Sequence, residues 1–283
     1  MKRKSKNENK GQNLKLALIF FLLIVFLITG SLIFKVGLLA KKSKFDGQHR
    51  FTAVFFKENN SGGIKVLSFA PDTKTISVLL INKKAYPLKP MLLDVEKYLG
   101  IPIDGFISLD VIDETKVQNA DSILQKAIFN FDKTKTNITI IDFIRLWFFA
   151  RTIPPRAITT EEISSEVKSN QLDKISSSLF IDNTLLQENQ SLQVINATDI
   201  MGLGSRLSRF LGNVGGSVVS ISTPKKNSGD SKIIYFGKKT YTAERLGKIL
   251  GFKIIDGGKD QQNESISDIV IIIGKDKLDL IPF

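Results

Sequence analysis

The sequence predicts an α/β protein in which a single N-terminal transmembrane helix precedes an α/β domain and a small C-terminal α/β sandwich of the β-α-β-β-α-β type. Three observations predict this fold class. Residues 16–34 are uncharged and almost all apolar. From residue 51 on, short runs of β-branched and aromatic residues alternate with segments of helical periodicity. From residue 191 on, the order strand–helix–strand occurs twice before a closing strand.

Residues 16–34 are expected to form a retained membrane anchor. At about 1.5 Å per residue, a helix over this run spans roughly the 30 Å hydrocarbon core of a bilayer. The apolar part of a cleaved signal peptide is shorter, about 7–15 residues, and ends at a site of small residues. The following segment, Val36–Ala40, offers no such pattern. A retained anchor is therefore favoured over a cleaved signal peptide.

The positive charge of the chain is concentrated around this anchor. Residues 1–50 carry +9 of the formal net charge of +12. Lysines beside a span meet anionic headgroups, and no basic cluster for nucleic acid is evident in the folded part. The basic tail, 1–15, has one more basic residue than the juxtamembrane linker, 35–50. The positive-inside rule then predicts a single-pass cell-membrane protein with a cytoplasmic N-terminus and an extracytoplasmic bulk.

The cysteine and histidine content of the chain limits the kinds of catalytic and metal site that it can form. The chain has no cysteine, which excludes disulfides, thiolate catalysis and cysteine-based metal sites. His49 is the only histidine and lies in the basic linker without a patterned partner. We therefore expect His49 to be a solvated linker residue rather than part of a catalytic triad or a metal site.

Residues 51–154 are expected to form the first folded domain, which Pro154-Pro155 closes. Its segment 140–151 is apolar nearly all round and contains the only tryptophan, Trp147. We expect a central core helix there, and the alternative is a helix with one face on lipid or on the membrane surface. The expected elements are strands 51–56, 64–69, 75–81 and 105–111 and helices 92–99, 120–129 and 140–151.

Residues 155–190 are expected to connect the domains, with a capping box at Thr159-Thr160-Glu161-Glu162 ahead of an amphipathic segment. The C-terminal domain is expected over 191–283. Its last strand is apolar enough to lie in the middle of a sheet. The expected elements are strands 192–195, 217–222, 232–236, 252–255 and 268–273 and helices 202–211 and 242–250.

Three separated phrases in this block carry a family resemblance. They are Val194-Ile195-Asn196-Ala197 followed by Gly202-Leu203-Gly204, Lys232–Phe236 followed by Thr242–Leu246, and Ser267–Asp276. In this order they resemble the opening, middle and end of the LytR C-terminal domain, which is found in bacterial envelope proteins. The resemblance covers roughly 191–277.

The middle of the chain is similar to a degenerate LytR–CpsA–Psr domain. Leu99–Phe106 resembles that family's turn and following strand, and Ala70–Leu80 resembles its early hairpin. Active members of the family transfer phosphate-linked glycopolymers from a polyprenyl pyrophosphate carrier onto peptidoglycan. Such chemistry needs arginines for the pyrophosphate and carboxylates beside a divalent cation such as Mg²⁺. At the family's motif positions this chain has Asn60 and Lys83 in place of arginine, and both carboxylates are gone.

The favoured function is therefore a non-catalytic, membrane-anchored envelope protein without a cofactor. Its expected partners are the membrane and a ligand that is peptidoglycan, an anionic wall polymer or another envelope protein. The alternative is a divergent glycopolymer–peptidoglycan ligase whose phosphate site uses Lys83, Lys84 and Asp110, with Mg²⁺. Asp110, Asp113 and Glu114 are otherwise expected to form a solvated loop and a helix cap.

A second candidate site lies in the C-terminal domain. Gly202 and Gly204 at a helix start, with Arg206 and Arg209 close behind, could hold an anion through backbone N–H groups. A lone G-x-G is a weak signal. Packing and capping are the favoured roles of these glycines.

Overall fold

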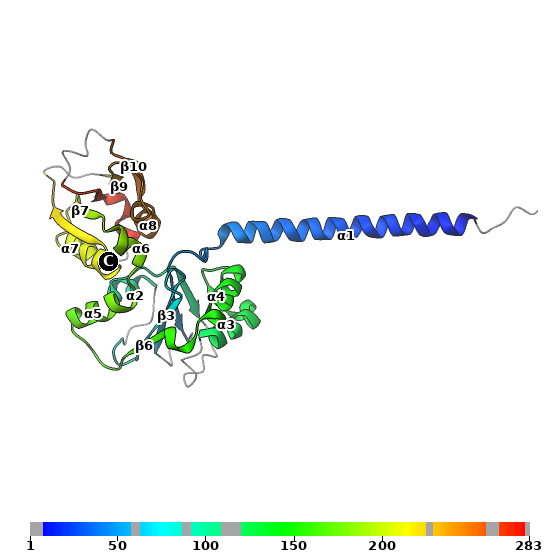
Figure 1. Ribbon diagram of the computed structural model, residues 1–283, viewed down its shortest axis with the longest axis horizontal. Helices are drawn as coiled ribbons and strands as arrows, with labels where there is room; N and C mark the ends of the chain where they lie inside the picture. The colour runs from blue at the N-terminus through cyan, green and yellow to red at the C-terminus, as the bar shows by residue number, and fades with distance from the viewer. Residues whose placement is uncertain are drawn as a thin grey trace, which may run out of the picture.

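The computed structural model describes residues 8–57, 63–86, 92–108, 120–224, 229–258 and 266–280. A single long helix, α1 (Glu8–Lys42), extends away from two folded lobes that meet near its C-terminal end (Figure 1). Within the described part, α1 is the one helix long and apolar enough to cross a membrane, over Lys15–Lys42, and none of that window is buried.

The first lobe is built on a six-stranded mixed sheet. Its strand order is β5-β4-β1-β2-β3-β6. β1, β2 and β3 form an antiparallel meander, whereas β4 pairs parallel to β1 and β6 pairs parallel to β3. The strands are β1 (Phe51–Phe56), β2 (Ile64–Ala70), β3 (Thr75–Ile81), β4 (Gly105–Ser108), β5 (Lys135–Thr136) and β6 (Ile158–Ile163).

Helices cover both faces of this sheet. α3 (Ala120–Phe129) and α4 (Ile140–Thr152) pack on the face that carries Phe55, and α2 (Leu92–Leu99) and α5 (Ser169–Leu179) pack on the face that carries Val54. Since neighbouring residues of a strand point to opposite faces, a sheet covered on both sides needs apolar residues at almost every position. β1 and β2 are buried at nearly every position, and their polar exceptions are Thr52, Lys65 and Ser68.

The end of the first sheet corrects the expectation for 155–190. β6 follows a short 3-10 helix, η3 (Pro155–Ala157), and extends the sheet beyond Pro154. Thr159–Glu162 is thus an exposed edge strand, and the predicted capping box there is wrong. β-Branched threonines suit an extended strand, and charged side chains protect an edge. The capping box in this lobe is formed by Thr139 and Asp142 at the start of α4.

The second lobe contains two parallel strand–helix–strand units around a central strand. Its strand order is β10-β9-β11-β7-β8, with β11 parallel to β7 and antiparallel to β9. The central position expected for the last strand is confirmed. The elements of this lobe are α6 (Asn183–Glu188), β7 (Ser191–Asn196), α7 (Leu203–Asn213), β8 (Ser217–Ser222), β9 (Lys232–Tyr235), α8 (Tyr241–Leu250), β10 (Lys253–Asp256), β11 (Ile269–Ile273) and the 3-10 helix η4 (Lys275–Leu280). A further short 3-10 helix, η2 (Phe131–Lys133), follows α3 in the first lobe.

α4 is an outer-layer helix rather than a central one. It buries Phe143, Leu146 and Ala150 against the sheet, but Ile144 is 38% exposed and Phe148 is 58% exposed. The expectation of a central core helix is therefore wrong for one side of α4. Apolar composition identified a packed helix but did not show that one of its apolar sides has no neighbour.

The segment after α1 is part of the fold. Asp142, fully buried, accepts hydrogen bonds from the Ser43 hydroxyl at 2.6 Å and from the backbone N–H groups of Lys44 and Phe45 at 2.8 Å each. Phe45 packs in the core beside Phe51. The Arg145 guanidinium donates to the Phe45 carbonyl at 3.0 Å. Residues 43–45 are thus fixed to α4, and α1 joins the first lobe without a free linker.

We predict that Asp142→Ala lowers the free energy of unfolding of the first lobe by about 3 kcal/mol, because it leaves buried donors unpaired. The measurement is thermal or denaturant unfolding of the detergent-solubilised chain. Asp132→Ala, at an exposed position on η2, is the matched control. Equal stabilities of the two variants would contradict the role given to Asp142.

Candidate functional site

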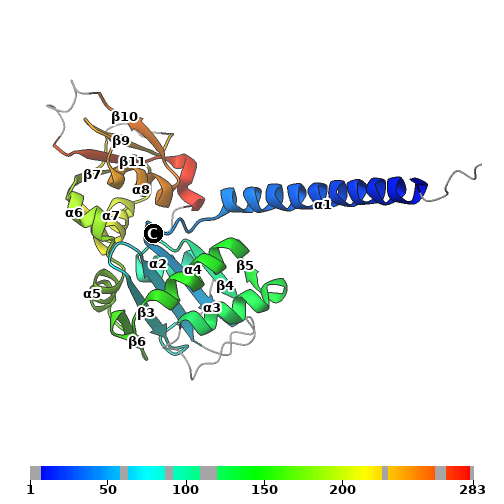
Figure 2. The ribbon, with the colours of Figure 1, turned by 45° about the vertical axis from the view of Figure 1, so that its right-hand side comes forward.

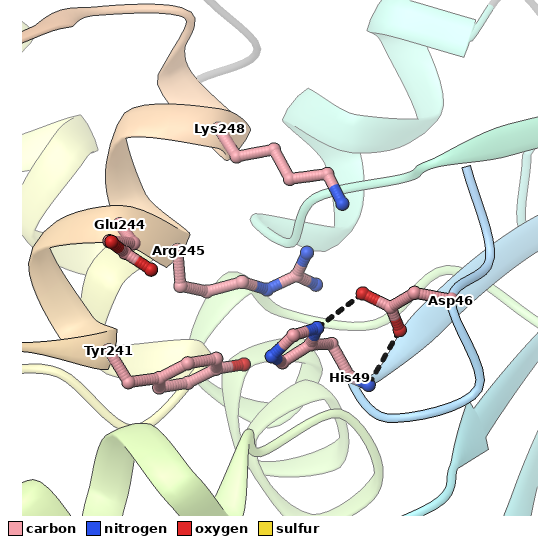
Figure 3. Close-up of a pocket in the computed structure, with 6 residues that line it drawn as sticks. All are labelled: Asp46, His49, Tyr241, Glu244, Arg245 and Lys248. Carbon is pink, nitrogen blue, oxygen red and sulfur yellow. Dashed lines mark hydrogen bonds and ion pairs between the residues drawn. The ribbon is translucent and has the colours of Figure 1, made fainter. Parts of the chain in front are cut away.

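A small charged pocket lies where residues 46–49 meet α8 of the second lobe (Figure 3). Its volume is about 110 Å³. That is room for a few water-sized groups and well below the ~300–1,000 Å³ typical of small-molecule sites. The pocket is lined by Asp46, His49, Tyr241, Glu244, Arg245 and Lys248.

His49 is held on one wall of this pocket. Its ring stacks on Tyr241 with centroids 5.1 Å apart and an interplanar angle of 15°. Its Nδ1 lies against Asp46 Oδ2. Burial alone would raise the pKa of Asp46, but hydrogen bonds from His49 and from the backbone of His49 and Gln48 outweigh it and lower this pKa to about 2. The expectation that His49 is a solvated linker residue is wrong.

Arg245 forms the floor of the pocket and joins three parts of the chain. Its side chain, on α8, is 5% exposed. One guanidinium nitrogen donates to the Arg50 carbonyl at 2.9 Å, another lies 3.6 Å from Asp104 Oδ1, and Nε lies 3.4 Å from Asp182 Oδ2. Asp104 precedes β4 and also accepts the Thr52 N–H at 2.9 Å. Arg245 therefore ties α8 to the segment after α1 and to the first lobe.

The start of α8 is fixed by acids from α6. Asp182, the N-cap of α6, accepts the Tyr241 hydroxyl at 2.6 Å. Burial, followed by this hydrogen bond, raises the pKa of Tyr241. Glu188 accepts from the backbone N–H groups of Tyr241 and Thr242 at 3.0 and 2.7 Å. A carboxylate at a helix N-terminus is favourable, so these contacts hold the pocket wall in place.

A second contact between the lobes involves Arg209, one of the predicted binding residues. Its Nε lies 2.6 Å from Asp173 of α5, and its other nitrogens donate to the Lys97 and Tyr98 carbonyls at 3.2 and 3.1 Å. Asn213 donates to the Leu99 and Gly100 carbonyls. Both α7 side chains therefore satisfy the last carbonyls of α2, where helices leave acceptors unpaired.

The other residues predicted beside Arg209 have surroundings of their own at the start of α7. Gly202 is the left-handed N-cap of α7, with φ of 76°. Gly204 packs so closely that an added Cβ would lie 2.9 Å from Ile221 Cγ2. Arg206 is exposed. In the structure Gly204 has a packing role and Arg209 an interface role.

The two lysines of the alternative phosphate site do not line either cavity. Lys83 and Lys84 are exposed in the turn after β3, and neither lines the pocket or the ~10 Å³ cavity beneath Arg245. Asn60, Asp110, Asp113 and Glu114 lie outside the described residues. Among the described residues, no group of three or more His, Asp or Glu side chains is placed to hold a metal ion, so no Mg²⁺ site is assigned.

Sequence comparison identifies the second lobe. Residues 189–276 match the family described as LytR cell envelope-related transcriptional attenuator. These residues form a LytR C-terminal domain. The domain contains α7, α8 and the whole second sheet, so the pocket lies between the LytR C-terminal domain and residues 46–49. The sequence matches no curated protein.

Solved structures from the LytR–CpsA–Psr family are similar to about half of the chain. The transcriptional regulator YvhJ of Bacillus subtilis is 17% identical, with 47% of this chain and 96% of that chain covered and a TM-score of 0.38. B. subtilis TagV is 15% identical, with 47% of this chain and 96% of TagV covered and a TM-score of 0.35. The LytR-CPS2A-psr family protein YwtF (TagT), solved with bound octaprenyl pyrophosphate lipid, is 14% identical. The match covers 48% of this chain and 92% of YwtF, with a TM-score of 0.35.

A buried acid lies beneath the contact between Asp104 and the LytR C-terminal domain. Glu96 of α2 is buried and accepts the Ile103 N–H at 2.8 Å. Burial raises its pKa to about 7, with Asp104 adding to the effect and the Ile103 hydrogen bond and Lys44 opposing it.

We predict that Arg245→Met separates the LytR C-terminal domain from the first lobe and destabilises the protein by about 3 kcal/mol, because Asp104 and Asp182 lose a buried partner. The measurement is denaturant unfolding together with limited proteolysis. Arg206→Met is the control, since it removes an exposed arginine from α7. An Arg245→Met protein as stable as this control would contradict the prediction.

We predict that Glu96→Gln flattens the pH dependence of stability. The folded Glu96 has a pKa of about 7, above its ordinary value of 4.5, so the unfolded chain binds fewer protons between these values. Stability should fall as pH rises through that window, and glutamine has no proton to lose. Thermal unfolding from pH 4.5 to 7 measures the effect, with Glu161→Gln on the exposed edge strand as control. An unchanged slope in Glu96→Gln would refute this assignment.

Proposed function

We propose that this chain is a non-catalytic, membrane-anchored binding protein of the cell envelope. In this proposal α1 crosses the membrane with the N-terminus in the cytoplasm, and the two lobes lie outside. The LytR C-terminal domain binds an anionic cell-wall polymer. The observation that carries the proposal is the match of residues 189–276 to a cell-envelope domain family. The candidate span Lys15–Lys42 supports the anchored arrangement.

The size and charge of the pocket favour binding over catalysis. A cavity of about 110 Å³ admits one polar group of a larger ligand rather than a whole substrate. Lys248 points into it in Figure 3, and no hydrogen bond or ion pair to its ammonium is found among the described residues. Glu244, by contrast, already pairs with Lys239 at 2.8 Å. A cation beside His49 for which the described residues supply no partner suits a phosphate-type group of a wall polymer.

We expect the full-length protein in detergent to cosediment with cell walls that keep their phosphate-containing polymer and not with walls stripped of it. Lys248→Gln should lower the bound fraction several-fold, because it removes the unpaired cation of the pocket. Lys174→Gln, an exposed lysine on α5, is the charge-matched control. Binding that is equal on intact and stripped walls would contradict the polymer as ligand. Arg206→Gln tests whether the start of α7 contributes instead.

The ligase alternative has its own test. The same protein would be incubated with Mg²⁺, peptidoglycan and a polyprenyl-pyrophosphate-linked glycan, and glycan attached to peptidoglycan would be measured. Transfer that is lost in Lys83→Gln and Lys84→Gln would overturn the non-catalytic proposal. No transfer by a preparation that still binds walls is the result that we expect.

A further inference from the structure

α4 presents an apolar face that the folded lobes leave uncovered. Ile144, Trp147 and Phe148 lie on one side of this helix, since residues three and four apart share a helix face; we call these three residues the aromatic face. Ile144 and Phe148 are exposed and Trp147 is half-buried. Arg151 continues this side, with its guanidinium carbon 4.9 Å from the centre of the Trp147 ring. At the end of the neighbouring helix α3, Phe129 is 77% exposed.

The aromatic face lies close to the end of the membrane anchor. Asp142 and Arg145, in the first turns of α4, bind residues 43–45, directly after α1. Figures 1 and 2 both show α4 near the C-terminal end of α1, with α3 packed next to α4. Apolar residues of α1 continue past Lys35 to Leu39. From there to Lys42 the helix rises only about 5 Å, and a headgroup layer is roughly 5–8 Å thick. With the hydrocarbon core ending at Leu39 rather than at the end of the 16–34 run, this geometry would place the start of α4 at the depth of the headgroups.

Charge and residue type around the aromatic face suit an anionic membrane surface. Tryptophan is enriched at the membrane–water interface, and arginine and lysine extend their charges to headgroups while their stems cover apolar surface. Among the described residues of this part, the exposed acids are Asp132 on η2 and Asp46 just after residues 43–45, whereas Asp142 is buried and fully hydrogen-bonded. The exposed basic residues around α3 and α4 are Lys41, Lys42, Lys44, Lys126, Lys133, Arg145 and Arg151.

We propose that the aromatic face is a second membrane contact, which lies in the headgroup region of the bilayer that holds α1. Ile144, Trp147 and Phe148 enter the interface, and Arg151 and the surrounding lysines bind anionic lipid phosphates. The proposal rests on the membrane anchor of the proposed function but not on its wall ligand. Its consequence is a fixed orientation, with α3 and α4 against the membrane and the rest of the two lobes directed away from it.

The single tryptophan makes this contact directly measurable. Trp147 is the only tryptophan in the chain, so emission excited at a wavelength selective for tryptophan reports on α4 alone, even with α1 inserted. The full-length protein is placed in lipid nanodiscs that contain anionic phosphatidylglycerol, with either ordinary or brominated acyl chains. We expect a clear loss of Trp147 emission with brominated lipid. Equal emission in both, with strong quenching by aqueous iodide, would overturn the proposal.

Variants separate contact by this face from general proximity to the bilayer. Phe148→Asp adds a charge at an exposed position and should weaken the quenching by brominated lipid. Met201→Asp, at a 92% exposed position in the LytR C-terminal domain, should leave it unchanged. Circular dichroism verifies that both variants fold, and Ile144→Ser is the milder substitute if Phe148→Asp does not. Quenching that all variants share with the original chain would overturn the proposal.

Two further measurements test whether the aromatic face prefers anionic lipid and whether its membrane contact is independent of wall binding. Nanodiscs made only of zwitterionic lipid should give less quenching than those with phosphatidylglycerol, and equal quenching would overturn the part given to the basic residues. Wall binding by Phe148→Asp is expected to match that of the original chain. Its loss, with lipid quenching intact, would overturn the separation of the two surfaces.

Discussion

One buried guanidinium holds the LytR C-terminal domain against the first lobe and against the segment after α1. Arg245 contacts the backbone at Arg50, the carboxylate of Asp104 and the carboxylate of Asp182, which belong to the segment after α1, the first lobe and α6. A buried charge is costly unless its partners are fixed in advance. They are fixed here, because Asp104 also holds the Thr52 N–H and Asp182 holds Tyr241 and caps α6. The prearranged partners of Arg245 thus contribute to how the LytR C-terminal domain is placed against the first lobe.

Much of the fold could be predicted because its apolar pattern is local. The central strand β11 has five consecutive apolar residues, and only a strand covered on both faces tolerates such a run. β6 could not be predicted in the same way. Its Thr-Thr-Glu-Glu sequence fits a helix start as well as an exposed edge strand, and the deciding fact is its pairing with β3, about 80 residues earlier. For α4, the apolar composition predicts a packed helix, but it does not indicate which side of that helix remains exposed.

The candidate pocket could not be predicted from the sequence, because its residues come from two segments that are far apart in the chain. His49 and Asp46 precede the first strand, whereas Tyr241 and Lys248 lie on α8, and no spacing rule links them. One signal could have been used. Arg245 occurs between Ala243 and Leu246 on the apolar side of an amphipathic helix, where a charge requires buried partners. The charge of Arg209 marks it as a candidate site residue in the sequence, but no sequence pattern indicates its partners on α2 and α5.

The hydrogen bonds that join the segment after α1 to α4 have a mechanical consequence. Residues 43–45 are bonded to Asp142 and Arg145, and Arg50 is bonded to Arg245, so a change in the tilt of α1 must rotate both lobes as one body. Transmembrane helices tilt in response to bilayer thickness. If α1 crosses the membrane as proposed, a tilt of α1 would also move the aromatic face relative to the bilayer, so the two membrane contacts together would limit the angle at which the LytR C-terminal domain projects.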